Sequence, residues 1–408
     1  MATAEWTAVK LDELGFVGRG KSRHRPRDAA FLYGGPYPFF QTGDIKAANF
    51  HLTEYTQTYS EEGLAQSKLW NPGTLCITIA ANIAESAILG IKGCFPDSVV
   101  GFVANPDKAD VRFIKYYMDT LKLQMQSVSR GATQDNLSLE KLLKFDFHVP
   151  PLPVQRRIAR ILSAYDELIE NDQRRIGILE EMGRAIYREW FVDFRFPGHE
   201  KLPRVASSLG NIPKGWEVQK LADFVTTKYG YTESTNAEPV GPRYLRGMDI
   251  NKTGYIDWAE VPYCPITPAD YVAYRLRVGD VVIIRMADPG KVGIVEQDVE
   301  AVFASYLIRV APKDNRLRPY FLFYLLESAE YYAYITGAST GATRKSASAG
   351  MIADYQFLLP PRQLVDLFET RVSKIRSLLT TLLKQTVNLR RTRNLLLPRL
   401  LARPAMSA

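Results

Sequence analysis

The sequence is poor in the residues that most often bind metals or form disulfides, with three cysteines and four histidines among 408 residues. Cys76, Cys94 and Cys264 are odd in number and far apart, so neither a disulfide framework nor a zinc site is predicted. We expect all three to be small buried side chains. No apolar run approaches the ~20 residues that a membrane-spanning helix needs, and the first residues do not resemble a signal peptide. The sequence therefore predicts a cytoplasmic protein with no membrane partner.

The motifs of common catalysts are also missing. The histidines lie apart from any partnered nucleophile, and HExxH, GxSxG and strand-linked GxGxxG patterns do not occur. Two Pro-Pro pairs, at 150–151 and 360–361, follow Val149 and Leu359, unlike the Asn/Asp-Pro-Pro-aromatic motif of amino-group DNA methyltransferases. These absences predict a chain that is not itself an enzyme, with no catalytic, cofactor-binding or metal-binding residue.

One stretch matches a nucleotide-binding pattern. Residues 15–22 fit GxxxxGK[ST] literally. A phosphate-binding loop must follow a buried strand and open a helix, whereas Pro26 prevents a helix from continuing here. The corresponding stretch near Gly230 lacks both the first glycine and the Lys-Ser pair. We therefore interpret the match as accidental.

The most informative feature present is an internal repeat. Trp6, Leu11 and Gly20 recur 210 positions later as Trp216, Leu221 and Gly230, and each copy ends in a Pro-Pro pair followed by a long helical stretch. Two copies are too few for a solenoid array, so the repeat predicts two similar heads, each followed by a helix.

Each head is predicted to be a mixed α/β domain, which makes the fold class α+β. Short β-rich runs separated by Gly, Pro and Asn precede a stretch with helical spacing in both copies. The expected strands are 75–79 and 99–103 in head one and 281–284, 301–304 and 306–310 in head two. The expected helices are 111–128 and about 319–336. Tyr331, Tyr332 and Tyr334 are interpreted as part of a core-facing helix and not as a base-stacking platform.

The two helical stretches carry heptad stripes of apolar residues, with steps of four and three. Each would run for about 38 residues, or roughly 57 Å. Because the first helix leads from head one towards head two and the second leaves head two, the stripes predict an antiparallel coiled coil with a pseudo-two-fold axis. The predicted seam residues are Ile158, Leu162, Ile169, Ile176, Leu179, Ile186, Trp190, Phe368, Ile375, Leu379, Leu382, Leu389 and Leu396.

Domain boundaries follow from the repeat and from a Pro/Gly/Ser-rich segment. We predict recognition-type domains at 1–150 and 215–360, helical spacers at 151–195 and 361–402, and a linker at 196–214.

Positive charge gathers in two places, which matters more than the net charge of +8. One is the run from Arg19 to Arg27. The other runs from Arg362 onward, with ten Lys or Arg against Asp366 and Glu369 only. Such runs are usually solvated faces, but they also suit phosphate contacts, which fix register without reading sequence.

A loop in each head shares Gly-Ala-Thr and then differs, with Gln134-Asp-Asn136 in one and Arg344-Lys345 in the other. Divergent polar side chains on a common backbone suit two domains that read different base sequences. A plain glycine-centred turn is the alternative, and the sequence leaves both open. The candidate DNA-binding residues are Arg19, Lys21, Arg23, Arg25, Arg27, Arg130, Thr133, Gln134, Asn136, Lys228, Arg243, Arg246, Thr343, Arg344 and Lys345.

Four stretches together resemble the specificity subunit of Type I restriction-modification systems, over essentially the full chain. They are 150–162 (PPLPVQRRIARIL), 190–198 (WFVDFRFPG), 212–216 (IPKGW) and 395–400 (LLLPRL). The resemblance implies two target-recognition domains, each reading half of an asymmetric bipartite site in double-stranded DNA. It also implies helices that dock two DNA methyltransferase subunits and, through them, restriction/translocase subunits. S-adenosylmethionine, ATP and Mg are then expected in the partners. The second copy departs from the first at 362–364, so the start of its helix is less well defined.

Two other interpretations remain open at this stage. The chain could be an enzyme, either a stand-alone DNA adenine methyltransferase or a P-loop ATPase, which binding of S-adenosylmethionine or turnover of ATP would reveal. It could also be a coiled-coil scaffold protein, which would leave the varied loops and the basic run unexplained.

Overall fold

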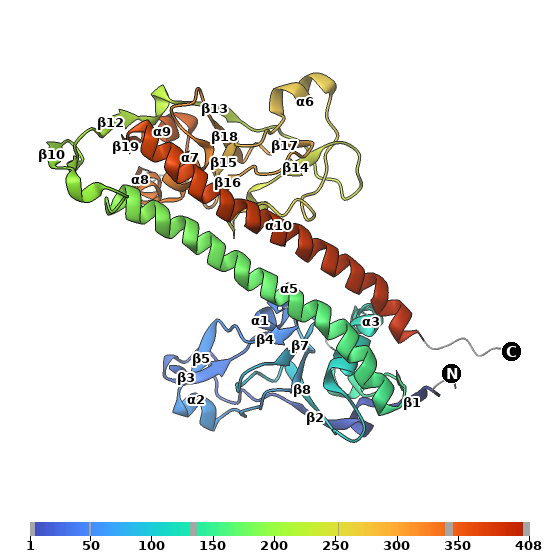
Figure 1. Ribbon diagram of the computed structural model, residues 1–408. Helices are drawn as coiled ribbons and strands as arrows, with labels where there is room; N and C mark the ends of the chain where they lie inside the picture. The colour runs from blue at the N-terminus through green and yellow to red at the C-terminus, as the bar shows by residue number, and fades with distance from the viewer. Residues whose placement is uncertain (1–4, 49, 131–136, 252, 339–345, 403–408) are drawn as a thin grey trace. The chain divides into compact units, whose positions relative to one another are not determined.

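The structure is a computed structural model that describes residues 5–48, 50–130, 137–251, 253–338 and 346–402. Contacts divide the chain into two compact units. Unit 1 is Met1–Asn171 together with Asn388–Ala408, and unit 2 is Asp172–Val387. Each unit therefore contains one head and a part of each long helix (Figure 1).

Head one is built on a five-stranded sheet in the order β2-β8-β6-β7-β4. The pairings are antiparallel except for β4 with β7. Every side chain of β6 and β7 is buried, as in a strand covered on both faces. The strands are β2 (Gly15–Arg19), β4 (His51–Leu52), β6 (Leu75–Thr78), β7 (Ser86–Leu89) and β8 (Val99–Ala104).

Helix α3 (Val111–Arg130) packs on this sheet through Phe113, Ile114 and Met118, which are fully buried in the main core of unit 1. The strands predicted at 75–79 and 99–103 and the helix predicted at 111–128 are confirmed. Smaller elements complete the head: β1 (Thr7–Val9) pairs with β9 (Phe147–Val149), and β3 (Tyr33–Phe39) with β5 (Gln57–Tyr59). Short helices are α1 (Thr42–Ala47), α2 (Glu61–Ala65) and α4 (Leu139–Leu142).

Head two repeats the plan with a four-stranded sheet in the order β13-β18-β15-β16. This is the head-one order without its last strand, so the predicted repeat and the mixed α/β class are confirmed. The strands are β13 (Val225–Tyr229), β15 (Val281–Ile284), β16 (Val292–Ile294) and β18 (Leu307–Pro312). Around them lie β12 (Glu217–Lys220) with β19 (Gln356–Leu359), β14 (Arg243–Leu245) with β17 (Ala301–Phe303), and helices α6 (Pro268–Tyr274) and α9 (Ala349–Ala353).

The single helix predicted at 319–336 is wrong. The structure has α7 (Pro319–Glu327) and α8 (Ala329–Ala338), separated at Ser328, whose backbone is extended. The Ser328 hydroxyl oxygen accepts a hydrogen bond from the Tyr331 amide, so it starts the second helix as a local side-chain cap. Tyr331 is buried and Tyr332 exposed, as a core-facing helix with surface variation requires.

The two long helices are α5 (Leu152–Tyr187), followed by a π-helical turn at Arg188–Val192, and α10 (Arg362–Leu401). Both begin directly after a Pro-Pro pair, so the uncertain start of the second helix lies at Arg362. In unit 1 the beginning of α5 contacts the end of α10, and in unit 2 the end of α5 packs with the beginning of α10. The helices are therefore antiparallel, as predicted.

The predicted seam residues are all buried or half-buried, but they do not form one continuous helix-to-helix interface. In unit 1, Ile158 and Leu162 belong to the core of head one, and in unit 2 Trp190 and Phe368 belong to the core of head two. Ile176, Leu179, Leu379 and Leu382 form a separate cluster between the two helices, against which Tyr255 of head two also packs. The outer parts of the apolar stripe therefore attach each long helix to a head. Its inner part packs the two long helices against each other.

The predicted linker at 196–214 is folded. It contains a hairpin of β10 (Arg204–Ser207) and β11 (Gly210–Pro213), and Phe196 and Ile212 are buried in the core of head two beside Trp216. Burial of those two apolar side chains attaches the linker to head two.

Candidate nucleic-acid interface

The basic run of head one lies on the surface. Arg19 ends β2, and Lys21, Arg23, Arg25 and Arg27 follow in a loop, all with exposed side chains. Arg27 forms an ion pair with Asp97 at 2.9 Å, and Arg19 donates to the Asp97 carbonyl at 3.0 Å. Within the described residues no carboxylate pairs with Lys21, Arg23 or Arg25. Arg25 donates to the backbone carbonyls of Ser22 and His24, both at 2.7 Å, so its charge is not neutralised by a carboxylate. Three of the five cations therefore keep a positive charge without an acidic partner among the described residues.

The apparent phosphate-binding pattern falls on β2, an antiparallel strand, and not on a loop that opens a helix. Its Gly20 serves packing, because an added Cβ would lie 2.3 Å from the carbonyl oxygens of Phe95 and Pro96. Gly230 in head two is equally confined, since an added Cβ there would lie 2.1 Å from the Ala304 carbonyl oxygen. The repeated glycine therefore marks a close backbone approach, which explains why it recurs without Lys-Ser.

The candidate cations of head two are engaged inside the domain. Lys228 donates to the Ala273 carbonyl, Arg243 donates to Val261 and lies over the Tyr263 ring, and Arg246 forms a two-pronged pair with Asp249. These contacts assign all three a structural part, and whether they also bind DNA stays a prediction.

The remaining candidates are on the two divergent loops. Thr133, Gln134, Asn136, Thr343, Arg344 and Lys345 lie outside the residues that the structure describes, and so does the side chain of Arg130. The structure does describe the backbone on either side of these loops.

In each head, a described residue close after the divergent loop is hydrogen-bonded to the same kind of turn. The Leu137 amide donates to the Ile79 carbonyl in head one at 2.9 Å, and the Ala347 amide donates to the Arg285 carbonyl in head two at 2.8 Å. Ile79 and Arg285 each directly follow a central strand and begin a turn, β6–β7 in head one and β15–β16 in head two. Sequence reasoning did not single out these turns.

The two turns share their hydrogen bonds at matching positions. Ala84 donates to Thr78 at 2.9 Å in head one, and Gly290 donates to Ile284 at 3.0 Å in head two. Left-handed backbone also recurs, at Ala81 (φ 57°) and Ala84 (φ 61°) and again at Ala287 (φ 71°) and Gly290 (φ 96°). A non-glycine residue in this region costs about 1 kcal/mol or more and persists only where the surroundings impose it. The left-handed conformation is thus part of the backbone structure that the two heads share.

The two heads share a second turn, which precedes the first along the chain. The Asp44 carboxylate accepts a hydrogen bond from the Gln41 amide, and the Asp249 carboxylate accepts one from the Arg246 amide, both at 2.8 Å. An aspartate at the equivalent position therefore stabilises the same turn in each copy. The side chains that project from this turn differ, with Gln41 and Lys46 in head one and Arg246 and Asn251 in head two.

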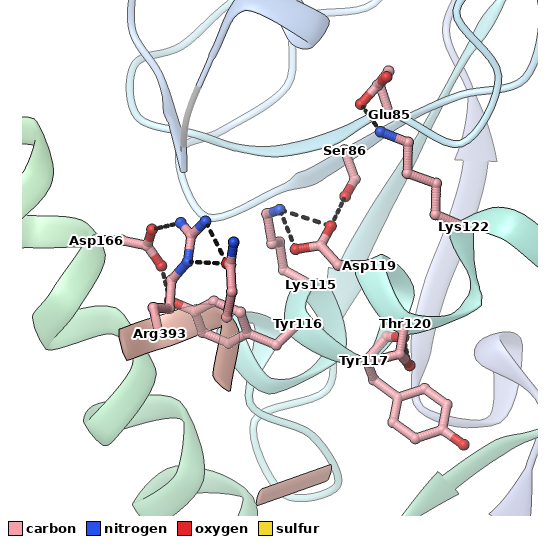
Figure 2. Close-up of polar contacts among 11 residues, drawn as sticks. Glu85, Ser86, Lys115, Tyr116, Tyr117, Asp119, Thr120, Lys122, Asp166 and Arg393 are labelled. Carbon is pink, nitrogen blue, oxygen red and sulfur yellow. Dashed lines mark hydrogen bonds and ion pairs between the residues drawn. The ribbon is translucent and has the colours of Figure 1, made fainter. Parts of the chain in front are cut away.

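Within unit 1, a buried acid ties head one to both long helices (Figure 2). Asp166 of α5, 1% exposed, accepts hydrogen bonds from the Tyr116 hydroxyl of α3 and from Arg393 of α10. Burial, followed by the charge of Asp166, raises the pKa of Tyr116, so its hydroxyl stays protonated and donates. Beside it, Lys115 pairs with Asp119 at 2.7 Å and Lys122 with Glu85 at 2.7 Å.

Within unit 2, the equivalent junction has a buried arginine where unit 1 has a buried acid. The repeat interval of 210 aligns Arg376 with Asp166, and Gly183 with Arg393. Arg376, 1% exposed, forms a two-pronged pair with Glu296 of head two at 2.6 and 2.8 Å. Gly183 leaves room for Tyr324, whose hydroxyl would lie 1.9 Å from an added Cβ. The heptad stripe did not reveal Asp166 or Arg376, because each needs a partner from a head.

A histidine forms a further link inside unit 1. His51 of head one hydrogen-bonds Glu170 of α5 through its Nδ1 atom at 2.9 Å, and this bond raises the pKa of His51. Its stabilising effect is complete below the ordinary histidine pKa and is lost as pH rises through the raised value. Because the imidazole is partly exposed, we expect less than about 1 kcal/mol. His51→Gln should flatten the fall in unit 1 stability as pH rises above the ordinary histidine pKa of about 6.5, measured by urea unfolding. An equal pH dependence in both proteins would contradict this assignment.

Among the described residues, no group of three His, Cys, Asp or Glu side chains is placed to hold a metal ion. All three cysteines are buried and free, as predicted. No helix in the described ranges is long and apolar enough to cross a membrane.

With the two heads and their antiparallel helices established, comparison with known proteins becomes informative. The sequence model of the family described as Type I restriction modification DNA specificity domain matches residues 3–181 and 213–395, once for each copy of the repeat. The chain belongs to this family of specificity subunits. Their shared fold is two tandem mixed α/β domains with long helices.

Individual relatives agree with that assignment. The chain is 23% identical to the Type I restriction enzyme MjaIX specificity subunit of Methanocaldococcus jannaschii, over 97% of this chain and 92% of the relative. It is 21% identical to the Type I restriction enzyme EcoBI specificity subunit of Escherichia coli, over 84% and 73%. The crystal structure of the S subunit from M. genitalium matches with a TM-score of 0.61 at 16% identity, over 98% and 97%.

Proposed function

We propose that this chain supplies the sequence specificity of a Type I restriction-modification complex, with each head reading one half of a bipartite, asymmetric site in double-stranded DNA. The observation that carries the proposal is the repeated frame. Two heads hold the same turns by the same backbone hydrogen bonds, yet present different polar side chains from them. Base edges in the major groove are read by such side chains, whereas phosphates are not sequence-specific.

The chemistry of the complex is proposed to reside in partners. Two methyltransferase subunits would carry S-adenosylmethionine and methylate adenine, and restriction subunits would use ATP and Mg. The chain itself would be a non-catalytic cytoplasmic subunit without a cofactor.

The long helices offer a surface for those partners. Leu168 and Leu378, separated by the repeat interval of 210, are 49% and 43% exposed, and Ile178 and Met182 are exposed on α5. Apolar side chains at equivalent positions of two helices suit two copies of one partner, because a pseudo-two-fold repeat presents each site twice.

The test is to map methylated adenines in DNA from cells that carry the complete system. The proposal expects one motif with two defined halves and an unread spacer. Binding of S-adenosylmethionine and methylation by the purified chain alone would favour the stand-alone methyltransferase. Unchanged methylation after deletion of this chain would favour a scaffold without DNA function.

The basic run of head one allows a separate prediction. Replacing Arg23 and Arg25 with alanine should weaken DNA binding by a similar factor for all sequences, and should lower the salt slope by about 2, because each phosphate contact contributes about 1. Binding would be measured over a range of salt concentrations with specific and unrelated duplexes. The matched control removes two exposed lysines of the same head, Lys92 and Lys144, and should leave the slope unchanged. Loss confined to the specific duplex would show base reading instead.

A further inference from the structure

A cavity of about 490 Å³ opens in head two beside the β15–β16 turn. Apolar side chains contribute Met248, Met286 and Tyr306, of which Met248 and Tyr306 are largely exposed. Polar groups are contributed by Glu233, Asn251 and Asp288. All of them belong to unit 2.

We propose that this cavity receives the edge of a DNA base, and that Asp288 and Asn251 in head two, with Asn82 and Lys46 at the equivalent places in head one, decide which base is accepted. The inference rests on the proposed function and deepens it, because it names the residues that distinguish the two half-sites.

The contents of the cavity suit a base edge better than a phosphate. Asp288 carries an acceptor carboxylate that no hydrogen bond or ion pair engages within the described residues, and Glu233 adds a second acid. Carboxylates repel phosphate but accept hydrogen bonds from exocyclic amines, N4 of cytosine or N6 of adenine. Asn251 can donate and accept. The ring of Tyr306 and the thioether of Met248 provide the apolar contact that a base or a thymine methyl group makes.

Arg246 also lines the cavity, but its guanidinium is held by Asp249 at 2.7 and 3.1 Å. It therefore supports the turn from which Met248 projects. We therefore assign Arg246 a positioning role and assign base recognition to Asp288, because only the Asp288 side chain has a hydrogen-bonding group that is not already engaged.

The four positions of the proposal are equivalent in the two heads by hydrogen bonding as well as by sequence order. Asn82 and Asp288 each follow the left-handed alanine of their turn, and each turn is closed by the same amide-to-carbonyl bonds. Lys46 and Asn251 each follow the buried isoleucine, Ile45 or Ile250, after the turn held by Asp44 or Asp249. In head one these two positions touch, since Lys46 donates to the Asn82 side-chain oxygen at 3.2 Å.

The chemistry at these positions differs in sign. Head two presents an acid and an amide, whereas head one presents a cation and an amide. Lysine donates to the acceptors N7 and O6 of guanine, and asparagine pairs with adenine. The left-handed backbone holds each turn in one shape on a fully buried pair of strands, so the reading side chains project from a rigid support.

The experiment uses the full chain in its complete system and maps methylated adenines for Asp288→Asn and for Asn82→Ala with Lys46→Ala. Each variant should relax one or more base positions in one half-site only, opposite halves for the two variants. The preference for the original base should fall by roughly 5- to 150-fold, as expected for loss of one good base contact. The controls are Asp298→Asn and Lys92→Ala, which make the same charge changes at exposed positions outside the cavity.

Failure of this inference and failure of the proposed function give different results. A wild-type system without a two-part motif would contradict the proposed function. A wild-type two-part motif that both variants keep unchanged would overturn the inference alone. Equal loss of methylation at all sites, in variants that assemble normally, would also overturn it, since the residues would then act on general affinity.

Discussion

Replacing Arg376 with alanine is expected to lower the free energy of unfolding of unit 2 by about 3–5 kcal/mol. Arg376 and Glu296 are almost completely buried and share two hydrogen bonds of 2.6 and 2.8 Å. Removing the guanidinium leaves a buried carboxylate without its partner, far from the water that would otherwise solvate it. Urea unfolding followed by tryptophan fluorescence would measure the loss.

A double variant separates the pair from the cost of orphaning one partner. Arg376→Met combined with Glu296→Leu should recover most of the lost stability, because replacing a whole buried ion pair with apolar groups is often neutral or stabilising. Lys374→Ala is the matched control, since Lys374 is exposed two positions earlier on α10. If Arg376→Ala unfolded at the same urea concentration as Lys374→Ala, the buried pair would not hold helix to head.

Leu382→Asp is expected to break the inner helix cluster and, with it, the assembly of the complex. Leu382 is 2% exposed and packs with Ile176, Leu179 and Leu379. A Leu→Ala truncation in such a site costs about 2–5 kcal/mol, and an unpaired carboxylate adds several more. We expect unit 2 to lose cooperative unfolding and the methyltransferase partner to be lost in co-purification.

Two variants on the same helix give this result its meaning. Gln385→Asp adds the same charge at an exposed position less than one turn away and should retain both folding and partner. Leu378→Asp changes an exposed leucine and should retain folding but reduce co-purification if the helix surface binds the methyltransferase. Normal assembly of Leu382→Asp would contradict the antiparallel packing.

Several local features were predictable because neighbouring residues decide them. The fully apolar run at 281–284 becomes β15 with the predicted bounds, and the helical spacing at 111–128 becomes α3. The break at Ser328 was not predictable from apolar spacing, because a serine inside a helix and a serine that caps the next one look alike in sequence. The burial of Phe196 and Ile212 inside the linker at 196–214 was not predictable either, since Pro and Gly content does not show which apolar side chains enter a core.

The sequence by itself determined that this protein has two similar heads and two long antiparallel helices, and it indicated the family. A 210-residue repeat and a heptad stripe are both periodic patterns in the sequence, so they can be recognised without the structure. Only the tertiary structure decided which polar residues matter to each other. Asp166 meets Tyr116 and Arg393 across 50 and 227 positions, and Arg376 meets Glu296 across 80. The structure alone also brought Asn251, Asp288 and Tyr306 to one cavity. Burial and hydrogen-bond geometry depend on distance in space, which spacing along a chain does not record.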